Sequence, residues 1–191
     1  MWLGYARFNI KGSKMTDSNL VDRAQRYARH HHEGQLRKGE AAEPYITHVA
    51  EVALLVRALE GDAIAQSAAW LHDVVEDCSP TLMDVEEEFG AEIAAVVAEV
   101  TDDKSLEKEQ RKARQVESAA TKSDRACLIK WADKTSNLNS IAKSPPPWSR
   151  ERKIEYIDWA CRVTERLPFR PVGAEELFKS AAIAARESLE T

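Results

Sequence analysis

The sequence has 191 residues, a length that suits one domain with a full hydrophobic core and excludes a large multidomain enzyme. Charged residues make up 31% and hydrophobic residues 43%, with 7 Gly and 7 Pro, which indicates a soluble helical protein and excludes a fibrous or largely disordered chain. The sequence has 27 basic and 32 acidic residues, for a net charge of -5, so we expect no bulk electrostatic binding of nucleic acid.

The predicted partners and location follow from what the sequence lacks. It has no run of about 18 apolar residues, the minimum for a membrane span. Residues 1–15 lack the apolar core and cleavage site of a signal peptide. Cys78, Cys127 and Cys161 have no paired spacing, which is typical of a reducing compartment and argues against disulfides or a thiolate zinc site. We therefore predict a cytoplasmic protein that binds neither membrane nor nucleic acid.

Apolar residues recur at steps of three and four from Asp17 onward, which is the helical period. Residues 1–16 lack this period and are interpreted as an N-terminal extension that precedes one domain over 17–191. No stretch alternates as a strand would, so we predict an all-α, single-domain bundle. The expected helices cover residues 17–34, 47–60, 62–77, 81–90, 91–100, 106–119, 123–143, 149–167 and 174–187.

Several helix ends carry local signals. Thr47 is a candidate N-cap, and Gly61 is the expected stop of the same helix. Thr81 and Asp84 have the spacing of a capping box, and Gly90 is expected to close the short helix that they begin.

Four polar residues interrupt the otherwise apolar helix predicted over 62–77. On a continuous helix, His72 stacks over Glu76 and Asp73 over Asp77, so all four point into one sector. Three carboxylates at the negative end of a helix dipole are unfavourable unless a cation offsets them. The simpler alternative is an acidic helix end that frays into water.

A second polar set lies on the helix predicted over 123–143. Lys130, Asp133 and Asn137 form one stripe on a helix whose other positions are mostly apolar. A buried Asp needs a partner, which could be an intrahelical ion pair with Lys130 or a metal. Together with His48, His72 and Asp73, Asp133 completes a set of two imidazoles and two carboxylates suited to Mn²⁺, Fe²⁺ or Zn²⁺. The carboxylates and the lack of thiolates favour Mn²⁺.

These residues resemble a known family. A separated His, a His-Asp doublet and a distal Asp define the HD superfamily of metal-dependent phosphohydrolases. The stretches that resemble the hydrolase domain of the RelA/SpoT alarmone enzymes more closely are HHEGQLRKG, EPYITH, HDVVED, VTDDK and KWADKTSNL. Their order and spacing, over about residues 20–167, are most similar to the stand-alone small alarmone hydrolases, including the metazoan SpoT homologue.

The resemblance implies an all-α fold and a hydrolase without a synthetase domain. The implied reaction removes the 3′-pyrophosphate of guanosine tetra- or pentaphosphate, giving GDP or GTP and pyrophosphate, with Mn²⁺ as the cofactor. The implied metal ligands are His48, His72, Asp73 and Asp133, the implied catalytic acidic pair is Glu76 and Asp77, and the residues matched to the nucleotide pocket are Arg37, Lys38, Lys104, Asn137 and Tyr156.

Lys134, Lys130, Lys38 and Lys104 are expected to supply a local positive field for the phosphates. Consecutive residues on a helix diverge by about 100°, so the run His30–His32 is not expected to bind one ion. His32 is interpreted as structural or supporting the site, and the other two as exposed.

Three alternatives remain open from the sequence. The same metal site could act on adenosine alarmones or on the 2′-phosphate of NADPH. A different class of protein, a catalytically inactive module that binds alarmones, would have no need to keep the water-activating set. Which of Glu76 and Asp77 handles the proton, and the oligomeric state, are also open.

Overall fold

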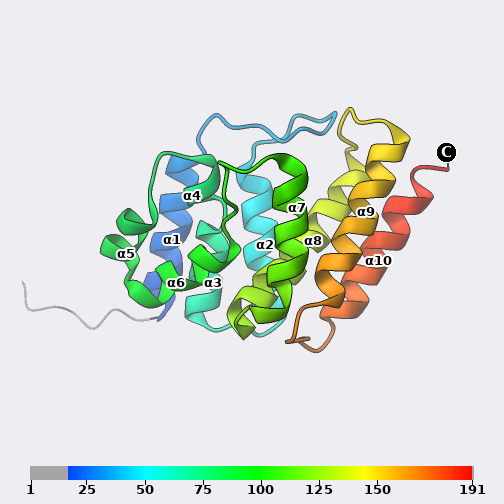
Figure 1. Cartoon of the computed structure of the whole chain (residues 1–191). Helices are drawn as coiled ribbons and strands as arrows, with labels where there is room; N and C mark the ends of the chain where they lie inside the picture. Colours follow the sequence, from blue (N-terminus) through cyan, green and yellow to red (C-terminus); the bar gives the residue numbers. More distant parts are fainter. Residues whose placement is uncertain (1–16, 191) are drawn as a thin grey trace, which may run out of the picture.

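A computed structural model describes residues 17–190 of the chain, and the predicted N-terminal extension lies outside them. Figure 1 shows an elongated bundle with α1, α4 and α5 near one end and α9 and α10 at the other. The helices are α1 (Asp17–His31), α2 (Ile46–Ala58), α3 (Ala63–Leu71), α4 (Val74–Asp77), α5 (Leu82–Phe89), α6 (Ala91–Val100), α7 (Lys108–Ser118), η1 (Ala119–Thr121), α8 (Asp124–Lys143), α9 (Arg150–Glu165) and α10 (Ala174–Glu187).

The predicted all-α fold is confirmed. Within residues 17–190, the β-structure is limited to one isolated bridge between Leu36 and Pro44. None of the described helices is long and apolar enough to cross a membrane. The capping box at Thr81 and Asp84 is present, and Gly90 closes that helix with a φ of 92°. Local signals therefore placed these helix ends correctly.

The helix predicted over 62–77 is not continuous. It breaks into α3 and α4 at His72 and Asp73, where Asp73 has a φ of -104° and a ψ of -5°. The predicted continuous helix, from which the stacking of His72 over Glu76 and of Asp73 over Asp77 was derived, is therefore wrong. The apolar spacing continues across the break, so periodicity alone does not reveal it. At the turn, the His72 ring bonds the Ala69 carbonyl and the Asp73 carboxylate accepts from the Tyr45 hydroxyl.

The ends of α2 also differ from the prediction. Its N-cap is Tyr45 rather than Thr47, whose hydroxyl instead donates to the Pro44 carbonyl at 2.8 Å. The left-handed residue after the helix is Glu60, with a φ of 61°, rather than Gly61. Gly61 is needed for space, because a Cβ there would lie 2.6 Å from Val56 Cγ1.

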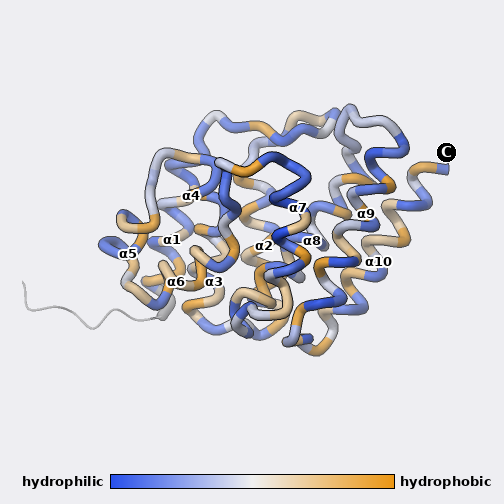
Figure 2. The backbone as a smooth tube through the Cα atoms, in the orientation of Figure 1, coloured by the Kyte–Doolittle hydropathy of each residue, from blue (hydrophilic) through white to orange (hydrophobic). Residues whose placement is uncertain are grey.

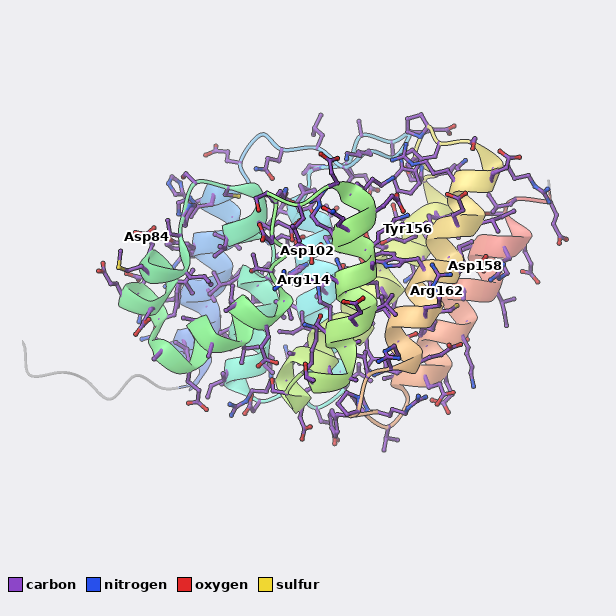
Figure 3. All side chains as sticks on the ribbon, viewed as in Figure 1. Asp84, Asp102, Arg114, Tyr156, Asp158 and Arg162 are labelled. Carbon is purple, nitrogen blue, oxygen red and sulfur yellow. The ribbon has the colours of Figure 1, made fainter. Side chains whose placement is uncertain are left out.

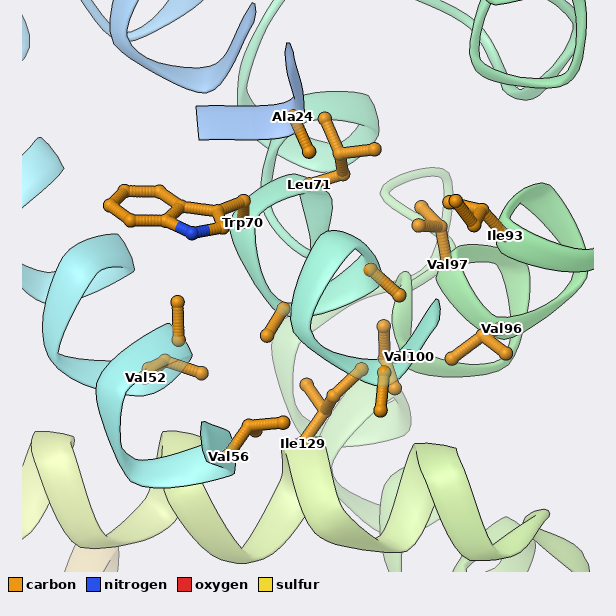
Figure 4. Close-up of a cluster of buried hydrophobic side chains, with 14 of the residues drawn as sticks. Ala24, Val52, Val56, Trp70, Leu71, Ile93, Val96, Val97, Val100 and Ile129 are labelled. Carbon is orange, nitrogen blue, oxygen red and sulfur yellow. The ribbon is translucent and has the colours of Figure 1, made fainter. Parts of the chain in front are cut away.

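The long helix α8 separates two hydrophobic clusters. One face, with Leu128 and Ile129, packs on α2, α3 and α6, as Figure 4 shows for Ile129 near Val56 and Val100, and α1 and α5 complete this cluster. Trp131 and Leu138, on another face, belong to the cluster that α9 and α10 complete. Figure 2 shows the matching alternation of hydrophobic and hydrophilic segments along the helices. Since both sides of α8 are covered, its polar residues are enclosed between the two halves.

Candidate functional site

Side chains from three segments meet beside the middle of α8. His48 comes from α2, His72 and Asp73 from the turn between α3 and α4, and Asp133 from α8. Nε2 of His48 lies 3.5 Å from Asp73 Oδ2 and 3.6 Å from Asp133 Oδ1. Nε2 of His72 lies 3.1 Å from Asp73 Oδ2. The structure thus brings all four predicted ligands together, although they span 86 positions in sequence (133 minus 48, plus one).

The hydrogen bonds of this cluster suit a cation. His72 Nδ1 lies 2.7 Å from the Ala69 carbonyl oxygen, so Nδ1 must donate. Nε2 of His72 is buried and, although it lies 3.1 Å from Asp73 Oδ2, makes no hydrogen bond of good geometry among residues 17–190. Ligand atoms of His48, His72 and Asp133 all lie within 4.8 Å of one another. A mixed nitrogen and oxygen set of this kind is suited to a divalent metal ion.

The pKa shifts lead to the same conclusion. Burial opposes ionisation of Asp73, but His72 and His48 hold its pKa well below the usual range. Burial also opposes ionisation of Asp133, whose pKa is lowered to about 2 by Lys134 and Lys130. Burial would lower the pKa of His72, yet the two carboxylates raise it to about 9. The cluster therefore favours ionised carboxylates around a positive charge, which a proton or a metal can supply.

Tyr45 is a residue that the sequence reasoning did not assign. Its hydroxyl donates to Asp73 Oδ2 at 2.7 Å. Burial and the Asp73 carboxylate raise the pKa of Tyr45, so the phenol stays protonated and remains a donor. It lies within the quoted stretch EPYITH, and its position three residues before His48 was the available signal.

Glu76 and Asp77 lie on α4, directly after the cluster. Glu76 Oε2 accepts from the backbone N–H of Asp102 at 3.1 Å, and burial together with the Asp102 carboxylate raises the pKa of Glu76. The ammonium of Lys104 contacts Asp77 and lies 3.7 Å from Glu76 Oε1. The loop after α6 thus holds both acids from one side. Figure 3 shows Asp102 and Tyr156 on opposite sides of α7 in that view.

On α8 the partner of Asp133 differs from the predicted one. Lys130 donates to the Val100 carbonyl at 2.8 Å, and no ion pair links it to Asp133 among the described contacts. Lys134 pairs with Asp133 at 3.0 Å and lies 4.3 Å from the centre of the Trp159 ring. The intrahelical pair with Lys130 is therefore wrong, and the adjacent Lys134 takes its place. Lys134 is only 3% exposed, so its positive charge is buried beside the cluster.

A cavity of about 490 Å³ opens beside the cluster. Among its lining residues are His48 from the cluster and Asp77 from the acidic pair. The nucleotide-pocket residues predicted from the sequence that line it are Arg37, Lys38, Asn137 and Tyr156. Its size and mixed lining are those of a small-molecule site.

A second cavity, of about 260 Å³, adjoins the first and shares Lys38, Trp148 and Tyr156 with it. Arg152 on its wall lies 4.4 Å from the Trp148 ring centre. The sequence reasoning had not assigned this wall, whose clustered cations in KEQRKAR were the available signal. Its further cationic lining residues are Lys108, Arg111 and Lys112.

The three consecutive histidines are not members of the His/Asp cluster formed by His48, His72, Asp73 and Asp133. His30 is exposed and His31 partly exposed, so the prediction is confirmed for His30 alone. His32 is buried, with Nδ1 2.8 Å from Gln35 Oε1 and 3.4 Å from Cys78 Sγ. These contacts connect the end of α1 to the segment after α4.

Comparison with known proteins assigns the family. Residues 24–157 match the HD domain. The chain is 46% identical over 144 residues to the Drosophila melanogaster protein named guanosine-3′,5′-bis(diphosphate) 3′-pyrophosphohydrolase MESH1, covering 74% of this chain and 80% of that protein. It is 41% identical over 165 residues to human MESH1, covering 85% and 92%.

Solved structures agree. The chain is 37% identical, with a TM-score of 0.82, to a structure described as a metazoan ortholog of SpoT that hydrolyzes ppGpp, covering 89% of this chain and 96% of the other. It also resembles lmo0812 from Listeria monocytogenes, at 27% identity and a TM-score of 0.63, covering 75% and 99%. The chain therefore belongs to the HD-domain family, where it groups with the MESH1 pyrophosphohydrolases.

Proposed function

We propose that this chain hydrolyses the 3′-pyrophosphate of guanosine tetra- and pentaphosphate, giving GDP or GTP and pyrophosphate. The observation that carries the proposal is the direct continuity of the His/Asp cluster, the Glu76–Asp77 pair and a cavity lined by cations and aromatic rings. The relatives whose names give this reaction align with most of this chain, which supports the same substrate class for it.

We propose that His48, His72, Asp73 and Asp133 hold one divalent ion. A bound divalent ion lowers the pKa of a coordinated water and polarises the phosphoryl oxygen under attack. Mn²⁺ is our preferred ion, because two carboxylates and two imidazoles without a thiolate suit it better than a structural zinc site. Tyr45 holds Asp73 in place through its hydroxyl.

Glu76 and Asp77 are the proposed acid–base pair. Water supplies a hydroxyl to the phosphorus and a proton to the 3′ oxygen as that ester bond breaks, so one group must take a proton and one must deliver it. The pKa of Glu76 is raised by burial and Asp102, so Glu76 holds a proton more readily than an ordinary carboxylate does. Asp77 is held by Lys104, and that lysine is exposed enough to reach a phosphate as well.

The remaining predicted residues are assigned to the nucleotide. Arg37 and Lys38 line the main cavity, and the planar guanidinium of Arg37 can both stack on a purine and pair with a phosphate. Asn137 and Tyr156 line the same cavity, and Arg37 donates to Asn137 Oδ1 at 3.4 Å. Lys134 is buried against Asp133 and Trp159, so we assign it to the positive field and to holding Asp133 rather than to direct substrate contact.

The test is a turnover assay on chelator-treated protein with added Mn²⁺ and guanosine tetraphosphate. Chromatography should show GDP and pyrophosphate formed in equal amounts, with no product before Mn²⁺ is added. Adenosine alarmones and NADPH serve as competing substrates in parallel reactions. Binding of guanosine tetraphosphate without any pyrophosphate release would contradict the proposal and favour an inactive binding module.

A further inference from the structure

A line of hydrogen bonds begins at His48 Nδ1, the ring nitrogen that does not face the His/Asp cluster. His48 Nδ1 lies 2.9 Å from Ser136 Oγ. Ser136 Oγ donates to Glu51 Oε2 at 2.6 Å, and Asn139 Nδ2 donates to Glu51 Oε1 at 3.0 Å. Glu51 lies one helical turn after His48 on α2, and Ser136 lies one turn after Asp133 on α8. The line therefore joins the two helices that carry His48 and Asp133.

The acceptor at the end of this line fixes the direction of every bond in it. An ionised carboxylate can only accept, so the single hydroxyl proton of Ser136 is committed to Glu51. Ser136 Oγ can then only accept from His48, and His48 Nδ1 must carry the proton. Nε2, which faces Asp73 and Asp133, is left with a free lone pair in the neutral ring. That is the tautomer that a metal requires.

The other imidazole reaches the same state by a different route. His72 Nδ1 donates to the backbone carbonyl of Ala69, an acceptor that no side-chain substitution removes. His48 depends on two side chains, and both are replaceable. Ser136 is fully buried, so water does not readily substitute for its hydroxyl.

We propose that Glu51 and Ser136 are positioning residues that hold the His48 ring in its metal-binding tautomer and orientation. Neither residue lines the main cavity, so they act through His48 and not on the substrate. The inference deepens the proposed function and rests on its metal site, but it is independent of which nucleotide is cleaved. Groups that support a metal-ligating histidine in this way typically contribute a factor of about 10–100 in metal affinity or activity.

Glu51→Gln is the most informative variant because it keeps the size of the side chain. A glutamine amide can donate to Ser136, which lets the line reverse and place a proton on His48 Nε2, towards the cluster. Ser136→Ala removes the line, and Ser136→Thr restores a hydroxyl. Glu87→Gln, at an exposed position on α5, makes the same charge change far from the line and is the matched control.

The measurements are the dissociation constant for Mn²⁺, from the electron paramagnetic resonance signal of free Mn²⁺, and the melting temperature of the metal-free protein. We expect Glu51→Gln and Ser136→Ala to raise the dissociation constant by about tenfold or more. Ser136→Thr should recover part of that loss, and Glu87→Gln should match the wild type. The metal-free melting temperature of Glu51→Gln should stay close to wild type, since its packing is kept.

Turnover separates this inference from the substrate assignment. In Glu51→Gln, saturating Mn²⁺ should restore kcat while the Mn²⁺ concentration for half-activity stays raised. If the wild type binds Mn²⁺ but does not cleave guanosine tetraphosphate, the substrate assignment fails and the Mn²⁺ affinities still decide the role of Glu51. An unchanged Mn²⁺ affinity in Glu51→Gln would overturn the inference, as would a wild-type protein that binds no Mn²⁺. Should Ser136→Ala fail to fold, the comparison of Glu51→Gln with Glu87→Gln still decides it.

Discussion

Arg37 and Asn137 are hydrogen-bonded at 3.4 Å although 100 positions separate them in the chain. The same asparagine donates through Nδ2 to Asp133 Oδ1 at 2.6 Å. Asn137 therefore joins Arg37, on the wall of the main cavity, to the His/Asp cluster. A change in the position of Arg37 would reach Asp133 through one side chain.

The role of Arg37 is testable with one variant that removes its side chain and one that keeps only its charge. We expect Arg37→Ala and Arg37→Lys both to raise KM for guanosine tetraphosphate by about tenfold, because a charged hydrogen bond contributes about 1.5–3 kcal/mol and lysine lacks the planar fork. Steady-state kinetics at saturating Mn²⁺ measures the effect. Arg26→Lys, at an exposed position on α1, is the control. Wild-type KM in Arg37→Lys would show that charge alone suffices.

The acidic pair should affect catalysis and spare metal binding. We expect Glu76→Gln or Asp77→Asn to lower kcat by about 10²–10⁴, the usual contribution of a positioned acid or base. Mn²⁺ affinity should change little, since neither side chain ligates the proposed ion. Rapid-quench turnover and Mn²⁺ binding are measured on the same preparations, with exposed Glu86→Gln as control. If both variants keep wild-type kcat, the acid–base assignment is wrong.

Substitutions of Asp73 and of its hydrogen-bond donor Tyr45 should weaken the same proposed metal site to different extents. Asp73→Ala removes a ligand and is expected to abolish Mn²⁺-dependent turnover. Tyr45→Phe removes only the hydroxyl that donates to Asp73 Oδ2 and should lower Mn²⁺ affinity or turnover by about tenfold. Mn²⁺ titrations of activity compare the two. Full activity of Asp73→Ala would mean that the cation lies elsewhere.

The end of α2 provides a test of the fold. Gly61→Ala should destabilise the protein by about 1–3 kcal/mol, because the new Cβ would lie 2.6 Å from Val56 Cγ1 and 2.9 Å from the Val56 carbonyl oxygen. Glu60→Gly should leave the free energy of unfolding nearly unchanged. Glycine removes the strain of a left-handed residue in the folded state, and its greater conformational entropy in the unfolded state offsets that gain. Urea unfolding monitored by circular dichroism measures both. Equal stability of Gly61→Ala and the wild type would contradict the close packing.

Much of the helical framework could be predicted because its signals are local. The bounds of α6 and α10 match the predicted ranges, and the capping box places the start of α5. Side chains that contact neighbours within one or two helical turns recur at regular intervals, so residue spacing in the sequence predicts these helices. Both ends of α2 differ from the prediction: Tyr45 is its N-cap, and Gly61 is required by its approach to Val56 and not by its own backbone angle.

The sequence by itself determined the helical class, and its residue types and motifs, with the family that they resemble, predicted a His/Asp metal-binding set and an adjacent acidic pair. The tertiary structure decided how that cluster is built. The α3–α4 break at His72–Asp73 and the line from His48 through Ser136 to Glu51 involve partners on other segments, Tyr45 among them. Lys130 donates to the Val100 carbonyl on α6, and Asp133 pairs with Lys134, its neighbour in sequence. Buried polar groups must find hydrogen-bond or charge partners wherever the fold supplies them, and sequence periodicity does not encode which distant residue that is.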